Sequence, residues 1–213
     1  MLEALAAEPD PHTTISDPKR ARDLHVADSL SGLEVDDLAR ARRIADMGAG
    51  PGFPGLVLAI ALPGARVDLI ESSGRKTAVI DRLLGAAKIH NARSVTARLE
   101  DWARVSPQLG GGREAYDAAT ARALASLAVL VEYAAPLLRP GGVLVAWKGA
   151  LPAAELDQGR AAAARVGMEV EDVLGVVPFP GAENRRLAVL RKTAPTPERF
   201  PRRAGMAAKR PLG

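Results

Sequence analysis

The segment Asp46-Met47-Gly48-Ala49-Gly50-Pro51-Gly52-Phe53-Pro54-Gly55 constrains the fold of this chain most, because it joins an acidic residue to a dense glycine turn. The apolar run 44–47 before it predicts a short buried strand, and the apolar run 56–62 after it predicts a helix. Glycines allow positive φ and let a ligand lie directly against the main chain. We therefore predict a nucleotide-binding turn between a first strand and its helix.

The residues within this turn indicate which nucleotide it binds. Gly50-x-Gly52-x-x-Gly55 fits the fingerprint of dinucleotide-binding proteins, and Glu71 follows at a spacing suited to a ribose contact. A pyrophosphate, however, needs free N–H groups at a helix N-terminus, and Pro51 and Pro54 remove two of them. Asp46 would add a negative charge that repels phosphate but suits the ammonium and sulfonium groups of S-adenosylmethionine. We therefore expect S-adenosylmethionine as the cofactor in preference to NAD.

Composition sets the broad class of the chain. With 213 residues, 47% of them hydrophobic, the chain can bury the core of one domain. It has no run of eighteen apolar residues, and Glu3, Glu8 and Asp10 stand where a signal peptide would be basic, so we expect a cytoplasmic protein without a membrane anchor. The absence of cysteine excludes disulfides and a cysteine nucleophile, and three scattered histidines predict no metal site.

Predicted strands and helices alternate along the chain. Alternation predicts an α/β fold with helices on both faces of a mostly parallel, seven-stranded, Rossmann-like sheet. The ligand would lie at the carboxyl ends of the strands, where the strand order switches. We expect strands at 44–47, 66–71, 94–97, 116–121, 143–147, 168–177 and 187–191, and helices at 56–62, 73–84, 124–138 and 152–166, the third of them stopped by Pro140-Gly141-Gly142.

Polar residues that follow three of these strands are candidates for the ligand site. Glu71 ends the second strand, where its carboxylate can accept both ribose hydroxyls, or it is a solvated acid. Leu99 and Glu100 follow the third strand and would face the adenine ring, although Glu100 is equally suited to cap a helix. Arg122 follows the fourth strand, close to where a methyl group would be delivered. Because its neighbours are apolar, it would need a partner such as the cofactor carboxylate or a phosphate.

The C-terminal part of the chain is strongly basic although the net charge is only +4. Such a segment favours a polyanionic partner, and the alternative is a solvated, poorly ordered terminus. Aromatic residues make up only 3% of the chain, which argues against an extended platform for stacking single-stranded bases. After Asn184 the only acid is Glu198, against Arg185, Arg186, Arg191, Lys192, Arg199, Arg202, Arg203, Lys209 and Arg210.

Several motifs together resemble those of the RsmG (GidB) methyltransferases, which methylate guanine N7 in 16S ribosomal RNA of the small subunit. The most specific are His25-x-x-Asp28-Ser29-Leu30, Gly52-Phe53-Pro54-Gly55 and Arg122-Ala123-x-Ala125-Ser126-Leu127. The resemblance extends in order over nearly the whole chain, through Thr14-Ile15-Ser16-Asp17-Pro18, Gly48-x-Gly50, Glu71-Ser72-x-Gly74-Arg75-Lys76, Lys148-Gly149 and Phe200-Pro201-Arg202-Arg203-x-Gly205.

The resemblance implies a Rossmann-like class I S-adenosylmethionine-dependent methyltransferase fold and a set of site residues. Cofactor contacts would fall on Gly48, Phe53, Leu99, Glu100 and Arg122, with Arg122 as the candidate catalytic residue; the turn and the strand ends add Asp46, Gly50, Gly52 and Glu71. The RNA contacts would fall on His25, Lys148, Arg202 and Arg203, and the partner would be 16S ribosomal RNA or the small ribosomal subunit. The alternatives are a packed histidine paired with Asp28 and an ordinary exposed lysine at Lys148.

The chain departs from the family pattern in two places. The family usually has two or three helices ahead of the 14–18 segment, whereas only residues 1–13 precede it here, so the cap is reduced or the chain is truncated. We expect a short helical cap over 1–40, a methyltransferase domain over 41–193 and a basic tail over 194–213. The family also tends to have arginine directly before the histidine, where this chain has Leu24, and Arg22 is the nearest substitute.

The expected chemistry needs few catalytic groups. Guanine N7 has a free in-plane lone pair and attacks a sulfonium methyl without losing a proton, so catalysis can rest on holding the two atoms in line. Enzymes that methylate exocyclic amines usually have an Asn/Asp-Pro-Pro-aromatic loop where this chain has Thr120-Ala121-Arg122-Ala123. We therefore predict a monomeric ribosomal RNA (guanine-N7) methyltransferase. The alternatives are an NAD(P)-dependent Rossmann reductase and a non-catalytic ribosome-binding or assembly protein.

Overall fold

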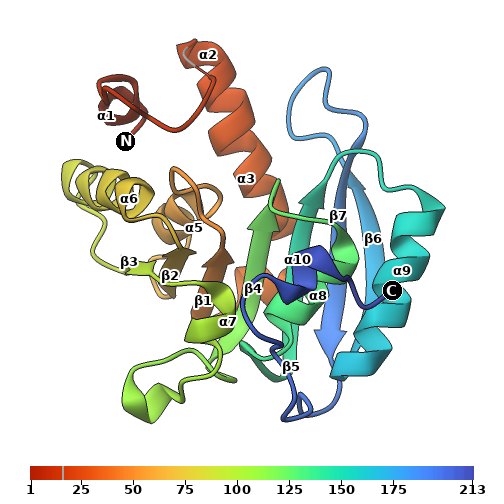
Figure 1. Cartoon of the computed structure of the whole chain (residues 1–213). Coiled ribbons are helices and arrows are strands. Elements are labelled where there is room, and N and C mark those ends of the chain that lie inside the picture. The colour runs from red at the N-terminus through yellow and green to blue at the C-terminus, as the bar shows by residue number, and fades with distance from the viewer. Residues whose placement is uncertain (16) are drawn as a thin grey trace.

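The protein is built around one seven-stranded sheet with the strand order β3-β2-β1-β4-β5-β7-β6, as seen in the computed structural model (Figure 1). Residues 1–15 and 17–213 are described; Ser16, which belongs to one of the motifs above, lies outside the described residues. The strands are β1 (Arg43–Met47), β2 (Arg66–Glu71), β3 (Ala92–Thr96), β4 (Tyr116–Arg122), β5 (Leu138–Lys148), β6 (Met168–Val176) and β7 (Arg185–Lys192).

The first five strands run parallel, and β7 runs antiparallel to both β5 and β6. Strand order reverses beside β1, because the chain proceeds from β1 to β2 and β3 on one side and then returns to place β4 on the other. In sheets of this kind, ligands bind at the carboxyl ends of the strands beside this switch. The topology confirms the predicted mostly parallel, Rossmann-like sheet.

Helices cover both faces of the sheet. Between the strands lie α5 (Gly55–Ala61), α6 (Gly74–Ala86), α7 (Leu99–Trp102), η3 (Pro107–Leu109), α8 (Leu127–Ala134) and α9 (Ala153–Val166), and α10 (Met206–Lys209) follows the sheet. Before it lie α1 (Leu2–Ala6), α2 (Pro18–Ala21), the π-helical η1 (Arg22–Ala27), α3 (Asp28–Leu30), η2 (Ser31–Glu34) and α4 (Asp36–Ala39). Figure 1 shows α2, η1 and α3 as one continuous rod of helix.

The two faces of the sheet carry separate apolar layers. On one face, Leu127 and Val131 of α8 are buried together with Phe200 and Leu212 of the C-terminal segment. On the other face, Leu56 of α5 and Ile80 of α6 are buried together with Leu38 of the N-terminal helices. Full burial of each such side chain stabilises the fold by roughly 1.5–3 kcal/mol. Both ends of the chain are therefore part of the core.

The predicted boundary between the helix after β4 and the strand β5 was wrong. The helix expected over 124–138 is the shorter α8, and Pro140-Gly141-Gly142 lies inside β5 rather than at the end of a helix. The strand begins early because Leu138 pairs with Tyr116, and a bulge follows before the regular pairing at Ala118. A Cβ on Gly142 would lie 2.8 Å from the carbonyl oxygen of Asp117, so the bulge depends on the close approach that glycine permits.

Candidate functional site

The glycine turn follows β1 and adopts a backbone that only glycine accommodates. Gly48, Gly50 and Gly52 have φ of +63°, +57° and +108°. A Cβ on Gly48 would lie 2.5 Å from a methyl group of Leu124, and one on Gly52 would lie 2.4 Å from a methyl group of Leu56. The turn therefore requires glycine both for its dihedral angles and for its close packing.

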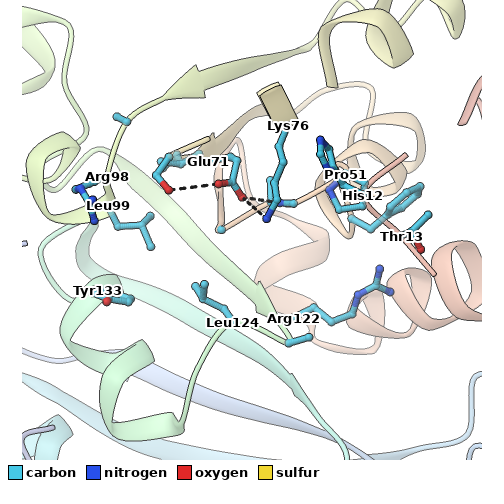
Figure 2. A pocket seen from close by; sticks show the side chains of 18 of the residues that line it. His12, Thr13, Pro51, Glu71, Lys76, Arg98, Leu99, Arg122, Leu124 and Tyr133 are labelled. Atoms are coloured by element: carbon cyan, nitrogen blue, oxygen red, sulfur yellow. Dashed lines mark hydrogen bonds and ion pairs between the residues drawn. The ribbon is translucent and has the colours of Figure 1, made fainter. Parts of the chain in front are cut away.

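A cavity of about 700 Å³ opens over this turn at the carboxyl ends of the central strands. Figure 2 shows side chains from several distant segments around it, among them Glu71, Leu99, Arg122 and Tyr133. Of the predicted cofactor contacts, those that line the cavity are Gly48, Gly50, Phe53, Glu71, Leu99, Glu100 and Arg122. Asp46 and Gly52 do not line it.

Glu71 holds two segments of the cavity wall together. One carboxylate oxygen accepts a hydrogen bond from the backbone N–H of Gly50 at 3.1 Å, and the other accepts one from the N–H of Ser73 at 2.9 Å. Lys76 places its ammonium 3.9 Å from the same carboxylate (Figure 2). Glu71 is 8% exposed, so it is not a solvated acid. Glu71 also lines the cavity.

Asp46 lies beneath the turn. Its carboxylate accepts hydrogen bonds from the N–H of Gly55 at 2.8 Å and from the hydroxyl of Thr120 at 2.9 Å. Burial raises the pKa of Asp46 to about 6, although both hydrogen bonds act to lower it. We predicted from the sequence that this carboxylate faces the ligand. In the structure its hydrogen bonds instead connect β1 to the start of α5 and to β4.

Glu100 joins the cavity to the C-terminal segment. It is 6% exposed, and its carboxylate accepts a hydrogen bond from the backbone N–H of Gly205 at 2.7 Å. Glu100 does not cap α7, because the capping position is Arg98. Gly205 and Ala208 complete this part of the wall. No local pattern in the sequence places them there, since they lie far along the chain from every other wall residue.

Arg122 is paired within the protein. Its guanidinium donates hydrogen bonds to the carbonyl oxygen of Leu24 at 2.8 Å and to the carboxylate of Asp28 at 3.0 Å. Figure 2 shows this side chain pointing away from Leu124 and toward the N-terminal helix. From the sequence we expected a cofactor carboxylate or a phosphate as the partner of Arg122. In the structure its partner is the carboxylate of Asp28. Burial lowers the pKa of Arg122, and Asp28 opposes the shift.

His25 lies against the same arginine. Its ring stacks on Phe53 with the centroids 4.4 Å apart, and the Arg122 guanidinium lies 5.9 Å from the centre of the Phe53 ring. Burial, together with the positive charge of Arg122, lowers the pKa of His25 to about 4. His25 is therefore neutral near pH 7, and it is a packed histidine that also borders the cavity.

The other three candidates for RNA contacts lie in different surroundings. Lys148 forms an ion pair with Glu155 at 2.7 Å and donates a hydrogen bond to the carbonyl oxygen of Ala125. Arg202 forms an ion pair with the buried Glu132 at 2.5 Å, so its charge is used inside the protein. Arg203 is exposed. Of Arg202 and Arg203, Arg203 is thus the one open to a polyanion.

A cavity of about 790 Å³ opens at the opposite edge of the sheet. It is lined by residues at the amino ends of the strands, including Arg43 and Arg66. Ligands of parallel sheets bind at the carboxyl ends, so the cavity over the glycine turn is the better cofactor site despite its slightly smaller volume.

Within residues 1–15 and 17–213, no group of three or more His, Asp or Glu side chains is arranged to hold a metal ion. No helix in that same part of the chain is both long and apolar enough to cross a membrane.

Comparison with known proteins points to one family. Residues 12–179 match the family described as GidB, rRNA small subunit methyltransferase G. The chain is 47% identical over 191 residues to the ribosomal RNA small subunit methyltransferase G of Rubrobacter xylanophilus, covering 88% of this chain and 72% of that protein. The protein of the same name from Roseiflexus castenholzii is 43% identical over 203 residues, covering 94% and 83%.

Solved structures agree on the fold. The S-adenosylmethionine-dependent methyltransferase SibL superposes with a TM-score of 0.60 at 16% identity, covering 89% of this chain and 61% of that one. The antibiotic-resistance methyltransferase Kmr superposes with a TM-score of 0.54 at 22% identity, covering 76% and 92%. At these identities the similarity shows the shared fold.

Proposed function

The chain belongs to the GidB family of ribosomal RNA small subunit methyltransferases G, and we propose that it transfers the methyl group of S-adenosylmethionine to N7 of a guanine in 16S ribosomal RNA. The observation that carries this proposal is the cavity over the glycine turn. Glu71, Leu99 and Glu100 line this cavity at the carboxyl ends of adjacent strands, where a nucleoside is bound in this type of sheet.

Each part of S-adenosylmethionine finds suitable chemistry in the cavity. Glu71 offers carboxylate oxygens to the two ribose hydroxyls, and such charge-assisted hydrogen bonds are the stronger kind. Leu99 and Glu100 line the part of the cavity that would hold the adenine ring and its amino group. The bare backbone at Gly48 and Gly50 leaves room for the methionine portion, and the buried Asp46 keeps the turn in shape from below.

The reaction itself needs only two partners held in line. The N7 lone pair of guanine forms a bond to the methyl carbon as the carbon–sulfur bond breaks, which leaves S-adenosylhomocysteine and a guanine with a positive charge. No proton has to leave N7, so the neutral His25 is not required as a base. Arg122 positions the wall through Asp28 and Leu24.

The test is the product. The purified chain is incubated with S-adenosylmethionine and with small ribosomal subunits, or with their naked RNA, from a strain that lacks this protein. We expect mass spectrometry of the digested RNA to find 7-methylguanosine at one position. A methyl group on an exocyclic amine would contradict the proposed atom, and no incorporation into either substrate would contradict the activity.

Ligand binding distinguishes the proposal from its alternatives. Calorimetry should detect S-adenosylmethionine and S-adenosylhomocysteine but not NADH, because Pro51 and Pro54 leave too few N–H donors for a pyrophosphate. Tight NADH binding alone would indicate a reductase. Binding of neither cofactor, with ribosome binding retained, would indicate a non-catalytic assembly protein. We also propose that the protein acts as a monomer in the cytoplasm, where a ribosomal substrate is found.

A further inference from the structure

A second cavity, of about 420 Å³, adjoins the cofactor cavity. The two cavities share His25, Arg122 and Ala123 as lining residues. The second one extends from this shared wall past the carboxyl end of β5 to Lys148 and to Glu155 of α9. A molecule in it would therefore lie directly beside the ligand of the first.

At the far end of this second cavity lies the carboxylate of Glu155, and one of its two oxygens contacts neighbouring groups of the protein. Glu155 Oε1 accepts a hydrogen bond from the N–H of Leu127 at 3.0 Å and lies 2.7 Å from the ammonium of Lys148. Within residues 1–15 and 17–213, no hydrogen bond to Glu155 Oε2 is found. Although burial opposes it, the Lys148 ammonium and the Leu127 N–H hold the pKa of Glu155 below its ordinary value. Glu155 is thus an ionised carboxylate, which accepts hydrogen bonds and donates none.

Within the described residues, two buried polar atoms at the near end of the second cavity have no hydrogen-bond partner. These are His25 Nδ1 and Asp28 Oδ1, on side chains that are 5% and 2% exposed as whole residues. Asp28 Oδ1 lies 3.2 Å from the Arg185 guanidinium, so an ion pair compensates its charge. Buried polar atoms in native proteins are nearly always bonded, so the unpaired His25 Nδ1, which carries a proton in one tautomer, points to an acceptor atom on a bound ligand.

We propose that the second cavity holds the target guanine and that Glu155 selects guanine by accepting hydrogen bonds from its N1–H and 2-amino groups. This inference rests on the proposed function. The base enters with N7 toward the wall shared with the cofactor cavity, which places its opposite edge at the far end, beside Glu155. Trp147 and Ala125 supply apolar surface for the rest of the base.

The donor pattern explains the selectivity. Guanine presents N–H groups on the edge that faces Glu155, whereas adenine has a bare N1 lone pair there and no 2-amino group. A carboxylate would repel that lone pair and leave its own oxygen unpaired. Sites that hydrogen-bond a substrate N–H reject the analogue that lacks it, because a buried polar group is then unsatisfied.

The experiment compares guanosine with inosine at the target position of a synthetic substrate RNA. Inosine keeps N7, O6 and N1–H but lacks the 2-amino group. For the wild-type protein we expect kcat/KM to be about tenfold to a hundredfold lower with inosine, the range for one lost hydrogen bond to a charged group. Equal rates on the two RNAs would overturn the proposal.

Two variants separate recognition from support of the fold. Glu155→Gln keeps an amide oxygen for the Leu127 N–H and turns its NH₂ toward the cavity. This NH₂ would face the N–H donors of guanine and could not accept from them, so the preference for guanosine should largely disappear. Glu155→Asp keeps the charge on a shorter side chain and should retain part of the preference. Asp157→Asn, on an exposed residue of the same helix, is the matched control and should leave the ratio unchanged.

The outcomes distinguish this inference from the proposed function. Failure of the wild-type protein to methylate guanosine would contradict the function, whatever Glu155 does. If Glu155→Gln lowers kcat/KM by the same factor for the guanosine and inosine RNAs, Glu155 has only a structural role and the inference is wrong. Calorimetry with S-adenosylmethionine should give an unchanged dissociation constant for all three variants, because Glu155 does not line the cofactor cavity.

Discussion

Arg122 and Asp28, which are 94 residues apart in the sequence, form an ion pair at 3.0 Å that joins the carboxyl end of β4 to the N-terminal helix. The side chains are only 15% and 3% exposed, so neither charge is well solvated. The pair lies on the wall between the cofactor cavity and the second cavity. Position 122 therefore affects the shape of both.

Removing Arg122 should destabilise the fold, because the buried carboxylate of Asp28 then keeps, among the described residues, one ion-pair partner, Arg185. We expect Arg122→Met to lower the free energy of unfolding by about 3 kcal/mol, the cost of breaking a buried pair. Urea unfolding measures this. Adding Asp28→Asn should restore much of the loss, whereas Arg40→Met, which breaks an exposed pair, should change little. A loss in the double variant equal to the sum of the two single losses would argue against the coupling.

Glu71 should dominate the ribose contact. Hydrogen bonds to charged groups are worth roughly 1.5–3 kcal/mol, so Glu71→Ala should weaken S-adenosylmethionine binding by about tenfold or more. It also frees the N–H groups of Gly50 and Ser73, which adds to the loss. Calorimetry gives the dissociation constant, and Glu169→Ala, on an exposed strand residue, is the control. An unchanged constant for Glu71→Ala would mean that Glu71 does not contact the ribose.

The sequence was informative where chemistry depends on local pattern. The glycine turn and the strand that ends at Glu71 follow from residue order alone, because a short apolar run predicts a strand and glycine permits positive φ. The carboxyl ends of parallel strands lie along one edge, so the sequence alone predicts that Glu71, Leu99 and Arg122 lie near one another.

Contacts between distant segments could not be predicted in this way. Gly205 lies 105 residues from Glu100, and nothing in the composition of a basic tail indicates that its backbone N–H completes the cavity wall. Asp46 was placed at the correct turn but on the wrong side of it, because sequence does not show which way a strand-end side chain points. Glu155 was missed for a related reason, since it lies in the first turn of α9, where acidic residues are common.

Acid should weaken the fold through His25. Burial holds its folded pKa near 4, below the ordinary 6.5, so its contribution is fully present above pH 6.5 and is lost as the pH falls toward 4. Since a tenfold change in proton affinity corresponds to about 1.4 kcal/mol, the loss should reach roughly 2–3 kcal/mol. Asp46 acts in the opposite sense, because its folded pKa of about 6 lies above the ordinary 3.8 and acid then favours the native state.

Comparison with a variant isolates the histidine from this opposing effect. From pH 7 to pH 4.5, the free energy of unfolding should fall more for the wild-type protein than for His25→Gln, which cannot take up a proton. Urea unfolding at a series of pH values checks this. His90→Gln, at an exposed histidine, should follow the wild-type curve. Parallel curves for wild type and His25→Gln would show that the folded pKa of His25 is not depressed.

Substitutions of the neighbouring residues Arg202 and Arg203 should have different effects on stability and on cofactor binding. Arg202 neutralises Glu132, which is 1% exposed, and it holds the segment whose Gly205 N–H reaches Glu100. Arg202→Met should therefore lower stability by about 3 kcal/mol and weaken S-adenosylmethionine binding, because Glu132 becomes an unpaired buried charge. Arg203 is exposed, so Arg203→Met should leave both properties unchanged.

RNA binding completes this comparison. If Arg203 contacts a phosphate, Arg203→Met should weaken binding to ribosomal RNA and lower the slope of log affinity against log salt by about 0.7–0.9. Filter binding at several salt concentrations measures the slope for each variant, and Arg202→Met should keep the wild-type slope since its charge is already paired. A reduced slope in Arg202→Met with none in Arg203→Met would reverse the assignment and make Arg202 the RNA contact.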